Sequence, residues 1–225
     1  MVPIEVRDVS RFDQVRFRGP GALKITQTNE ESLTVHAPAY VIKHIISEVK
    51  DGVLYVGYKS PKVTPLRVLK EVISFDLSVK DIREISVTGS GAVIVPDLDN
   101  DTVRVEINGS GKVNLGHLTA DNFRATIQGA GHIRAQGDVE TQAIVVNGSG
   151  KVMLDHLVSD FAHVILNGSG KVSMSVSDEL NVVINGSGEV SYGGFPDITK
   201  AITGSGALTR RRRVKDRSTA GEDHG

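Results

Sequence analysis

Cysteine and tryptophan are absent from this chain of 225 residues, and aromatic residues make up only 4% of it. Without cysteine there are no disulfide bonds, thiolate metal sites, cysteine nucleophiles or lipidated N-terminal cysteine. With few aromatic residues, a core must be built from Val, Ile and Leu, which suit closely stacked strands. No run approaches the ~18 apolar residues of a transmembrane helix. The N-terminus MVPIEVRDVSRFDQV also lacks the basic and apolar regions of a signal peptide.

A strong net charge is missing as well, but the value of -1 hides an asymmetry. Residues 209–225 hold six Lys or Arg and three Asp or Glu, and subtracting these from 26 and 27 leaves 20 basic and 24 acidic residues. The mildly acidic body argues against nucleic-acid binding through it. We predict that 209–225 is a disordered basic tail. Its run Arg210–Arg213 is typical of solvated tails, and the alternative is contact with an anionic partner.

The chain does contain a repeated G-x-G triplet between β-branched residues, as in INGSGKV, and it occurs seven times. The first glycines recur at intervals of 20, 20, 19, 20, 18 and 18 residues, and an eighth triplet, Gly19-Pro20-Gly21, lies far upstream. Self-similarity at this period is typical of a solenoid. The seven triplets contain Gly89, Gly91, Gly109, Gly111, Gly129, Gly131, Gly148, Gly150, Gly168, Gly170, Gly186, Gly188, Gly204 and Gly206.

The residues around each triplet alternate between apolar and polar, which indicates strands with one buried face. A third apolar position follows a turn-like pair in each repeat, and we align Leu98, Leu118, Val139, Leu157, Leu180 and Ile198 there. Three buried segments in 18–20 residues predict an all-β fold, a right-handed parallel β-helix with three sides and about seven coils over 85–208.

The glycines have an architectural interpretation and a catalytic alternative. A dinucleotide-binding fingerprint needs a third glycine and a following helix, whereas here a strand follows each triplet. We therefore predict structural turn glycines. They either permit a backbone angle closed to other residues at a corner, which we favour, or leave room in a narrow interior.

Residues 1–84 lack the regular repeat, and we predict that they form a β-rich cap together with the first coil or coils. The stretch AYVIKHIISEVK places Val41, Ile42, Ile45, Ile46 and Val49 on one helical face, so we expect a short helix near 39–48. KDG at 50–52 predicts a turn before VLYVGY. This cap would shield a sheet edge that otherwise invites pairing with other chains.

Outward positions in successive coils form polar columns that define a possible ligand face. Stacked amides explain the asparagine column as a structural ladder, and the functional alternative is recognition of a repetitive ligand such as a glycan. The aromatic platforms usual in sugar-binding faces are missing from it. The face comprises Asn108, Ser110, Lys112, Asn147, Ser149, Lys151, Asn167, Ser169 and Lys171.

The turns before the third apolar position carry alternating carboxylates and imidazoles. Aligned coils give Asp97, His117, Asp138, His156, Glu179 and Asp197 in roughly equivalent places. Such a ladder is a candidate divalent-metal site, but solvated turns that avoid stacking like charges would show the same alternation, and this is the explanation we favour. We predict no resident metal, no cofactor and no enzymatic activity, because no denser carboxylate cluster or Ser-His-Asp arrangement is found. A polysaccharide-acting enzyme would require this ladder.

The chain resembles the putative auto-transporter adhesin, head GIN domain family of bacterial proteins. The resemblance rests on RFDQVRFRGPGALKITQ, ESLTVHA, EVKDGVLYV and the serial ISVTGSGAV-type coils, and covers roughly residues 4–208. It implies a right-handed β-helix without an established activity, exported or at the cell surface. The leading hypothesis is a non-enzymatic scaffold that binds a glycan or envelope surface, with self-association as a further option. The alternative is an intracellular assembly module that docks through its Arg-rich tail.

Overall fold

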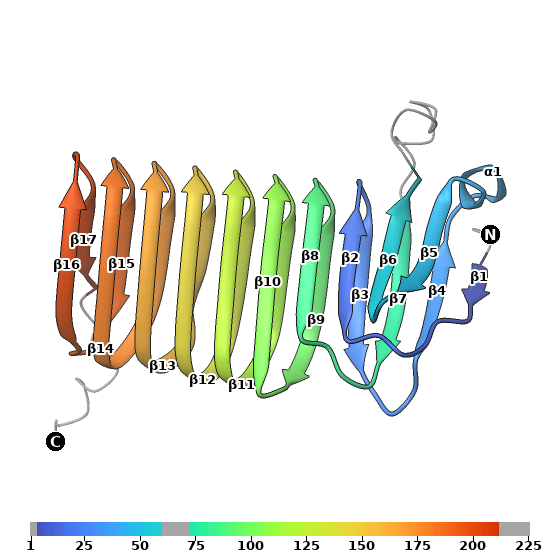
Figure 1. Ribbon diagram of the computed structural model, residues 1–225, viewed down its shortest axis with the longest axis horizontal. Helices are drawn as coiled ribbons and strands as arrows, with labels where there is room; N and C mark the ends of the chain where they lie inside the picture. The colour runs from blue at the N-terminus through green and yellow to red at the C-terminus, as the bar shows by residue number, and fades with distance from the viewer. Residues whose placement is uncertain (1–3, 60–72, 212–225) are drawn as a thin grey trace, which may run out of the picture.

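A computed structural model describes residues 4–59 and 73–211, in which the chain forms a rod of stacked coils (Figure 1). Each coil runs up one face, turns at a G-x-G triplet and returns along another face, so that the path winds right-handed. We call the face that leads into the triplet the entry face, the face that leaves it the exit face, and the turn itself the GSG corner. The predicted right-handed parallel β-helix is confirmed.

Each regular coil has three sides, as its burial pattern shows. In the coil after Gly109, buried side chains alternate along three runs, which are 113–115 on the exit face, 118–120 on a short side and 123–127 on the entry face. Successive residues that are not buried separate the runs at 116–117, 121–122 and 128–130. Because neighbouring residues of a straight strand point to opposite faces, two successive outward residues mark a bend. The chain therefore bends three times in each coil.

The two long faces contain nearly all the strands. From the N-terminal end, the entry face stacks β5 (Ile45–Lys50), β6 (Val53–Tyr58), β2 (Gln14–Arg18), β8 (Glu84–Gly89), β10 (Thr102–Gly109), the second halves of β11 (Lys112–Gly129), β12 (His132–Gly148), β13 (Lys151–Gly168) and β14 (Lys171–Gly186), and β16 (Asp197–Thr203). The exit face stacks β1 (Ile4–Arg7), β4 (Ser32–His36), β7 (Ser74–Val79), β3 (Ala22–Gln27), β9 (Ala92–Asp99), the first halves of β11–β14, β15 (Glu189–Gly193) and β17 (Ala207–Arg210).

The core consists of aliphatic columns that run along the rod. One column on the entry face joins, coil by coil, Val105, Ala125, Ile144, Val164 and Val182. Among the described residues no charged side chain is buried, and the buried polar residues are Ser86, Gln142 and Ser159. Val, Ile and Leu make up most of the interior, as the shortage of aromatic residues predicts. A few rings are also buried, among them Phe17, Phe75 and Phe123.

The N-terminal coils are stacked out of chain order. Strands β2 and β3, joined at Gly19-Pro20-Gly21, form a complete layer between β6/β7 and β8/β9. The Gly19 amide donates to Thr88 O at 3.0 Å, so the eighth triplet occupies the same corner as the other seven. After β1, the chain therefore forms this layer before most of the outer strands, and then crosses over it to continue the rod.

The predicted helix near 39–48 is only partly present. Helix α1 spans Ala39–Ile42, whereas Ile45–Lys50 forms β5, which pairs antiparallel with β6. The reason is the Asp51-Gly52 turn, in which both residues have positive φ (52° and 76°). A tight turn of this kind demands a strand on both sides. The helical spacing of Ile45, Ile46 and Val49 is overruled by this hairpin.

The C-terminal end of the described rod is an open coil. Strand β17 extends to Arg210, and the Arg211 amide donates to Tyr192 O at 2.8 Å, so the boundary predicted at residue 209 is wrong by at least three residues. These residues continue the exit-face pairing with β15, which polar side chains do not prevent. The rest of the predicted tail, 212–225, lies outside the described residues.

The predicted third apolar column is not a single column. Leu118 pairs with Leu98 and Gly137, and Leu157 also pairs with Gly137. Val139 instead pairs with Ala120, while Leu180 and Ile198 follow Ala162 on the entry face. The coils differ in length, and the register shifts at the short side, between Leu154 and Val158. Alternating patterns look alike at either register, so the alignment of the repeats missed the shift.

Candidate functional site

The GSG corner is a strained turn that only glycine permits, and each glycine has its own reason. Gly129, the first of its triplet, has φ 122°, a backbone region that other residues avoid. Gly131, the second, is buried, and a Cβ there would lie 2.5 Å from Ile107 Cγ2 of the preceding coil. Both explanations drawn from the sequence therefore hold, one for each glycine.

The residues that flank the glycines are displayed outward at a constant pitch. Neighbouring coils lie ~4.8 Å apart, so each outward residue type forms a straight column. In one column the Asn167 amide donates to Asn147 Oδ1 and the Asn185 amide donates to Asn167 Oδ1, both at 2.8 Å. Asn108, four coils before Asn185, donates instead to Glu106 Oε1 at 3.0 Å. The amide ladder is thus present at its C-terminal half.

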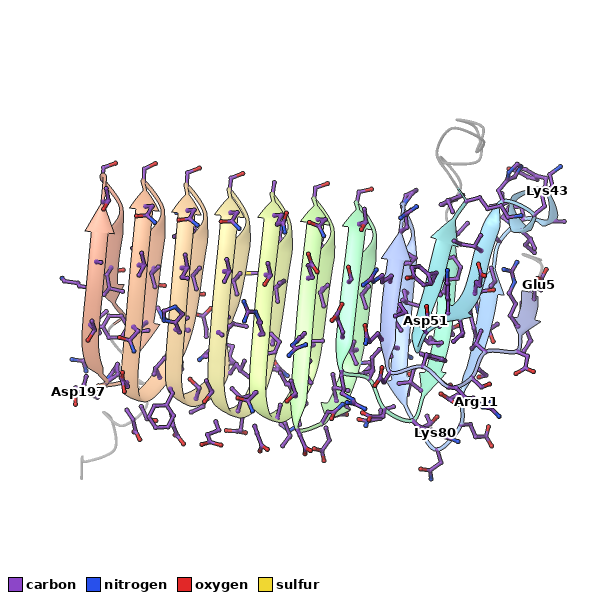
Figure 2. The ribbon with its side chains drawn as sticks, in the orientation of Figure 1. Glu5, Arg11, Lys43, Asp51, Lys80 and Asp197 are labelled. Atoms are coloured by element: carbon purple, nitrogen blue, oxygen red, sulfur yellow. The ribbon has the colours of Figure 1, made fainter. Side chains whose placement is uncertain are left out.

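The serine column beside this ladder is exposed at the tip of the corner. The amide of Ser149 donates to Gly129 O, and the amide of Ser169 donates to Gly148 O, both at 3.0 Å. Their side chains remain at the surface, with those of Ser110 and the other triplets. Figure 2 shows this row of short polar side chains along the corners. The corner thus offers hydroxyl and amide groups in parallel rows.

The exit face begins with a third column, and this one is basic. Register places Lys112, His132, Lys151 and Lys171 directly above one another. Lys171 alone has a carboxylate partner there, Glu189 at 3.1 Å. The sequence-predicted face residues from Asn108 to Lys171 are therefore brought together on one continuous surface. His132 completes the column, and Arg134 lies beside it two residues further along the same strand.

The carboxylate and imidazole ladder, weighed in the sequence as a candidate metal site, is not formed. His117 pairs with Asp97, but in the next coil Gln136, and not Asp138, is the partner of His156. Asp138 pairs with Thr119 and Val158. A register shift between Leu115 and Leu118, where one coil is a residue shorter, moves Asp138 out of the column. Among the described residues, no group of three or more His, Asp or Glu side chains is arranged to hold a metal ion.

Glu179 and Asp197, aligned with the same ladder, also lie elsewhere. They pair with each other, and Glu179 pairs with Phe161, at the bend where the short side meets the entry face. The short side nevertheless gathers carboxylates. Figure 2 shows acidic side chains along the edge opposite the GSG corners, where Asp197 is labelled. This edge is a negatively charged surface, not a coordination site.

Two open grooves arise where the chain crosses over the β2/β3 layer, a feature with no sequence signal. The crossing segment between β7 and β8 is fixed by Arg83, whose amide donates to Asp13 O at 2.7 Å and whose guanidinium contacts the Asp13 carboxylate at 2.9 Å. On one side lies a groove of about 560 Å³, lined by Gln27, Lys80, Asp97, Asp99 and His117 among others. The other groove, of about 550 Å³, is lined mainly by charged residues of both signs, including Asp81, Glu84, Asp101 and Arg104.

Gln27 joins the two sides of the first groove. Its amide donates to Asp99 O at 3.0 Å and to Lys80 O at 3.3 Å, and its oxygen accepts from the Asp99 amide at 3.0 Å. These contacts hold the crossing segment to the neighbouring coil. The position depends on the out-of-order stacking, which brings residues 72 apart in the chain into contact.

Known proteins share this architecture. The family model described as "Putative auto-transporter adhesin, head GIN domain" matches residues 11–196. A crystal structure of a putative adhesin from Bacteroides fragilis is similar with a TM-score of 0.82 and 20% identity, covering 93% of this chain and 96% of that chain. A putative adhesin from Parabacteroides merdae has a TM-score of 0.73 and 17% identity, with 94% and 96% covered.

A third similar structure, from Parabacteroides distasonis, is described as a putative lipid binding protein. It has a TM-score of 0.70 and 22% identity, with 93% of this chain and 96% of that chain covered. Identities at this level show the shared fold alone. No curated protein matches the sequence. No helix in the described part of the chain has the length and apolar character needed to cross a membrane.

Proposed function

Because the chain belongs to the auto-transporter adhesin, head GIN domain family, we propose that it is a non-enzymatic scaffold, exported to the cell surface, that binds a repetitive envelope glycan. The binding surface is the GSG corner together with the adjoining exit face. The observation that carries the proposal is the set of parallel polar columns at one pitch, uncovered by any other described part of the chain. A polymer with a repeated unit can use the same contact in successive coils, and weak contacts then add up.

The alternative, docking through the arginine tail, is less well supported. Arg210 lies over the Phe195 ring at 3.5 Å, and Arg211 contacts the Asp155 carboxylate and Met174 O. Two of the four arginines are therefore engaged with the solenoid. Arg212 and Arg213 lie outside the described residues.

Protease treatment of intact cells tests the proposed location. We expect the protein to be lost from cells that retain an uncleaved cytoplasmic marker. Complete protection, with the protein in the soluble cytosolic fraction, would contradict an adhesive role at the surface.

Blocking the corner tests the binding surface. Ser149 and Ser169 are exposed, so replacing both by Tyr covers the corner without entering the core. We expect S149Y/S169Y to lose retention on isolated envelope polysaccharide. The matched control, T119Y/H156Y, places the same side chains at exposed positions of the short side and should bind like the parent chain. Equal binding by both variants would show that the corner is not the site.

A further inference from the structure

Basic and acidic side chains lie on different sides of the rod, although the net charge of the whole chain is near zero. Outward positions of the exit face carry a basic stripe, which we define as Lys112, His132, Arg134, Lys151 and Lys171, all exposed. No Asp or Glu lies between 108 and 120 or in 129–136, 148–154 and 168–177, the segments that hold these residues and their corners. The first carboxylate to join the column is Glu189, at its end.

The short side has the opposite character. Its segments, 96–102, 116–122, 136–141, 155–161, 175–179 and 193–197, contain no lysine or arginine. They carry Asp97, Asp99, Asp101, Asp121, Asp138, Glu140, Asp155, Asp160, Asp178, Glu179 and Asp197. One edge of the rod is therefore acidic along its regular coils, and a separate face is basic.

The basic stripe has a repulsive energy that the fold itself does not relieve. Like charges stacked in neighbouring strands repel one another, and here Lys151 lies one coil spacing from Lys171. Lys112 lies two coils from Lys151, with no acidic residue between them in the column. Within the stripe, Lys171 has a carboxylate partner, Glu189 at 3.1 Å. An external chain of anions laid along the stripe would relieve the repulsion at every coil.

We infer that the basic stripe binds an extended acidic polysaccharide that runs parallel to the long axis of the rod. This inference rests on the proposed function and names the class of its ligand. The stripe adjoins the amide and hydroxyl columns of Asn147 and Ser149, which suit the hydroxyl groups of sugars. It carries no aromatic residue on which a nucleic-acid base could stack. The acidic short side repels the same polymer, so binding is confined to one face.

Binding to immobilised dextran sulfate, with uncharged dextran of equal length as the comparison, tests the inference on the full chain. We expect K112Q/R134Q/K151Q to lose roughly tenfold or more in affinity, and the slope of log affinity against log salt to fall by roughly two to three. The matched control, R18Q/R104Q/R124Q, removes three exposed arginines from the entry face and should keep the parent affinity. R212Q/R213Q tests the tail, and far-UV circular dichroism confirms that each variant is folded.

Four results would overturn the inference. The control could weaken binding as much as the stripe variant, or the tail variant could abolish it. Uncharged dextran could bind as well as dextran sulfate, or single-stranded oligothymidylate could bind more tightly. If K112Q/R134Q/K151Q no longer binds dextran sulfate but still binds envelope polysaccharide, the inferred anionic class of the ligand is wrong and the proposed function stands. Loss of envelope binding by S149Y/S169Y alone would support the corner without the stripe.

Discussion

Gly150→Ala is the sharpest test of why the repeat has two glycines. The new Cβ would lie 2.6 Å from Ile127 Cγ2, 3.1 Å from Ile127 Cδ1 and 3.2 Å from Gly131 O. Carbon atoms in contact normally stay ~3.5–4.0 Å apart, and forcing an extra methyl group into a packed core costs ~1–3 kcal/mol. The loss of backbone freedom in the unfolded chain returns ~0.4–1 kcal/mol. We therefore expect a net loss of ~1–2 kcal/mol in the free energy of unfolding.

A double-mutant cycle with Ile127→Ala separates steric conflict from any other effect of the substitution. Ile127 is fully buried, so its truncation alone should cost ~2–5 kcal/mol. Because truncation removes both short contacts with its side-chain carbons, G150A/I127A should be about as stable as I127A alone. Guanidinium unfolding followed by circular dichroism measures the four corners of the cycle, with Ser149→Ala as the exposed control. If G150A costs no more than S149A, the interior has room and the argument from crowding is wrong.

Three further predictions concern the ladder and the open end. Asn167→Ala removes two amide contacts and should lower the free energy of unfolding by ~1 kcal/mol. The control Ser169→Ala, at a neighbouring exposed site, should lower it by no more than ~0.5 kcal/mol. Equal effects of the two substitutions in chemical denaturation would show that the ladder does not stabilise the protein. Lys200→Val should cause end-to-end association, so that the mass measured by light scattering rises with protein concentration. Thr199→Val, on the outer face of the same strand, should not associate. A K200V variant that stays monomeric would contradict this prediction. Arg211→Ala should speed amide exchange in β17, and unchanged exchange there would show that Arg211 does not hold the strand.

The regular coils could be predicted from the repeat because each one reproduces the same local environment. Alternation around residues 103–115 specifies which side chains enter the core, and the recurrence of the triplet specifies where the chain turns. The outward columns follow from the constant spacing of the repeat, so Asn147, Asn167 and Lys151 could be assigned to one surface from the sequence alone. Local rules suffice wherever one coil is stacked directly on an equivalent one.

Register at the short side could not be predicted, because it depends on which residues a bend absorbs. Asp138 and His156 fall at similar distances from their triplets, yet the bend from Met153 to His156 contains one residue more than the bend from Arg134 to Gln136. The crossover grooves were equally inaccessible. They exist because residues 14–27 are inserted between strands that come later in the chain, and no local pattern encodes that order of stacking.

The two ends of the rod follow from the same repetition. Because each coil offers its neighbour the same register, nothing in the repeat itself limits stacking, and a second molecule could continue it. At the N-terminal end the antiparallel strands β5, β4 and β1 replace the regular coil. At the other end the column of Val105 and Val182 finishes in Lys200, between half-exposed Ile198 and Ile202. A charge at an inward position penalises any aliphatic column placed against it, so the long faces and not the ends are left as the surfaces for a ligand.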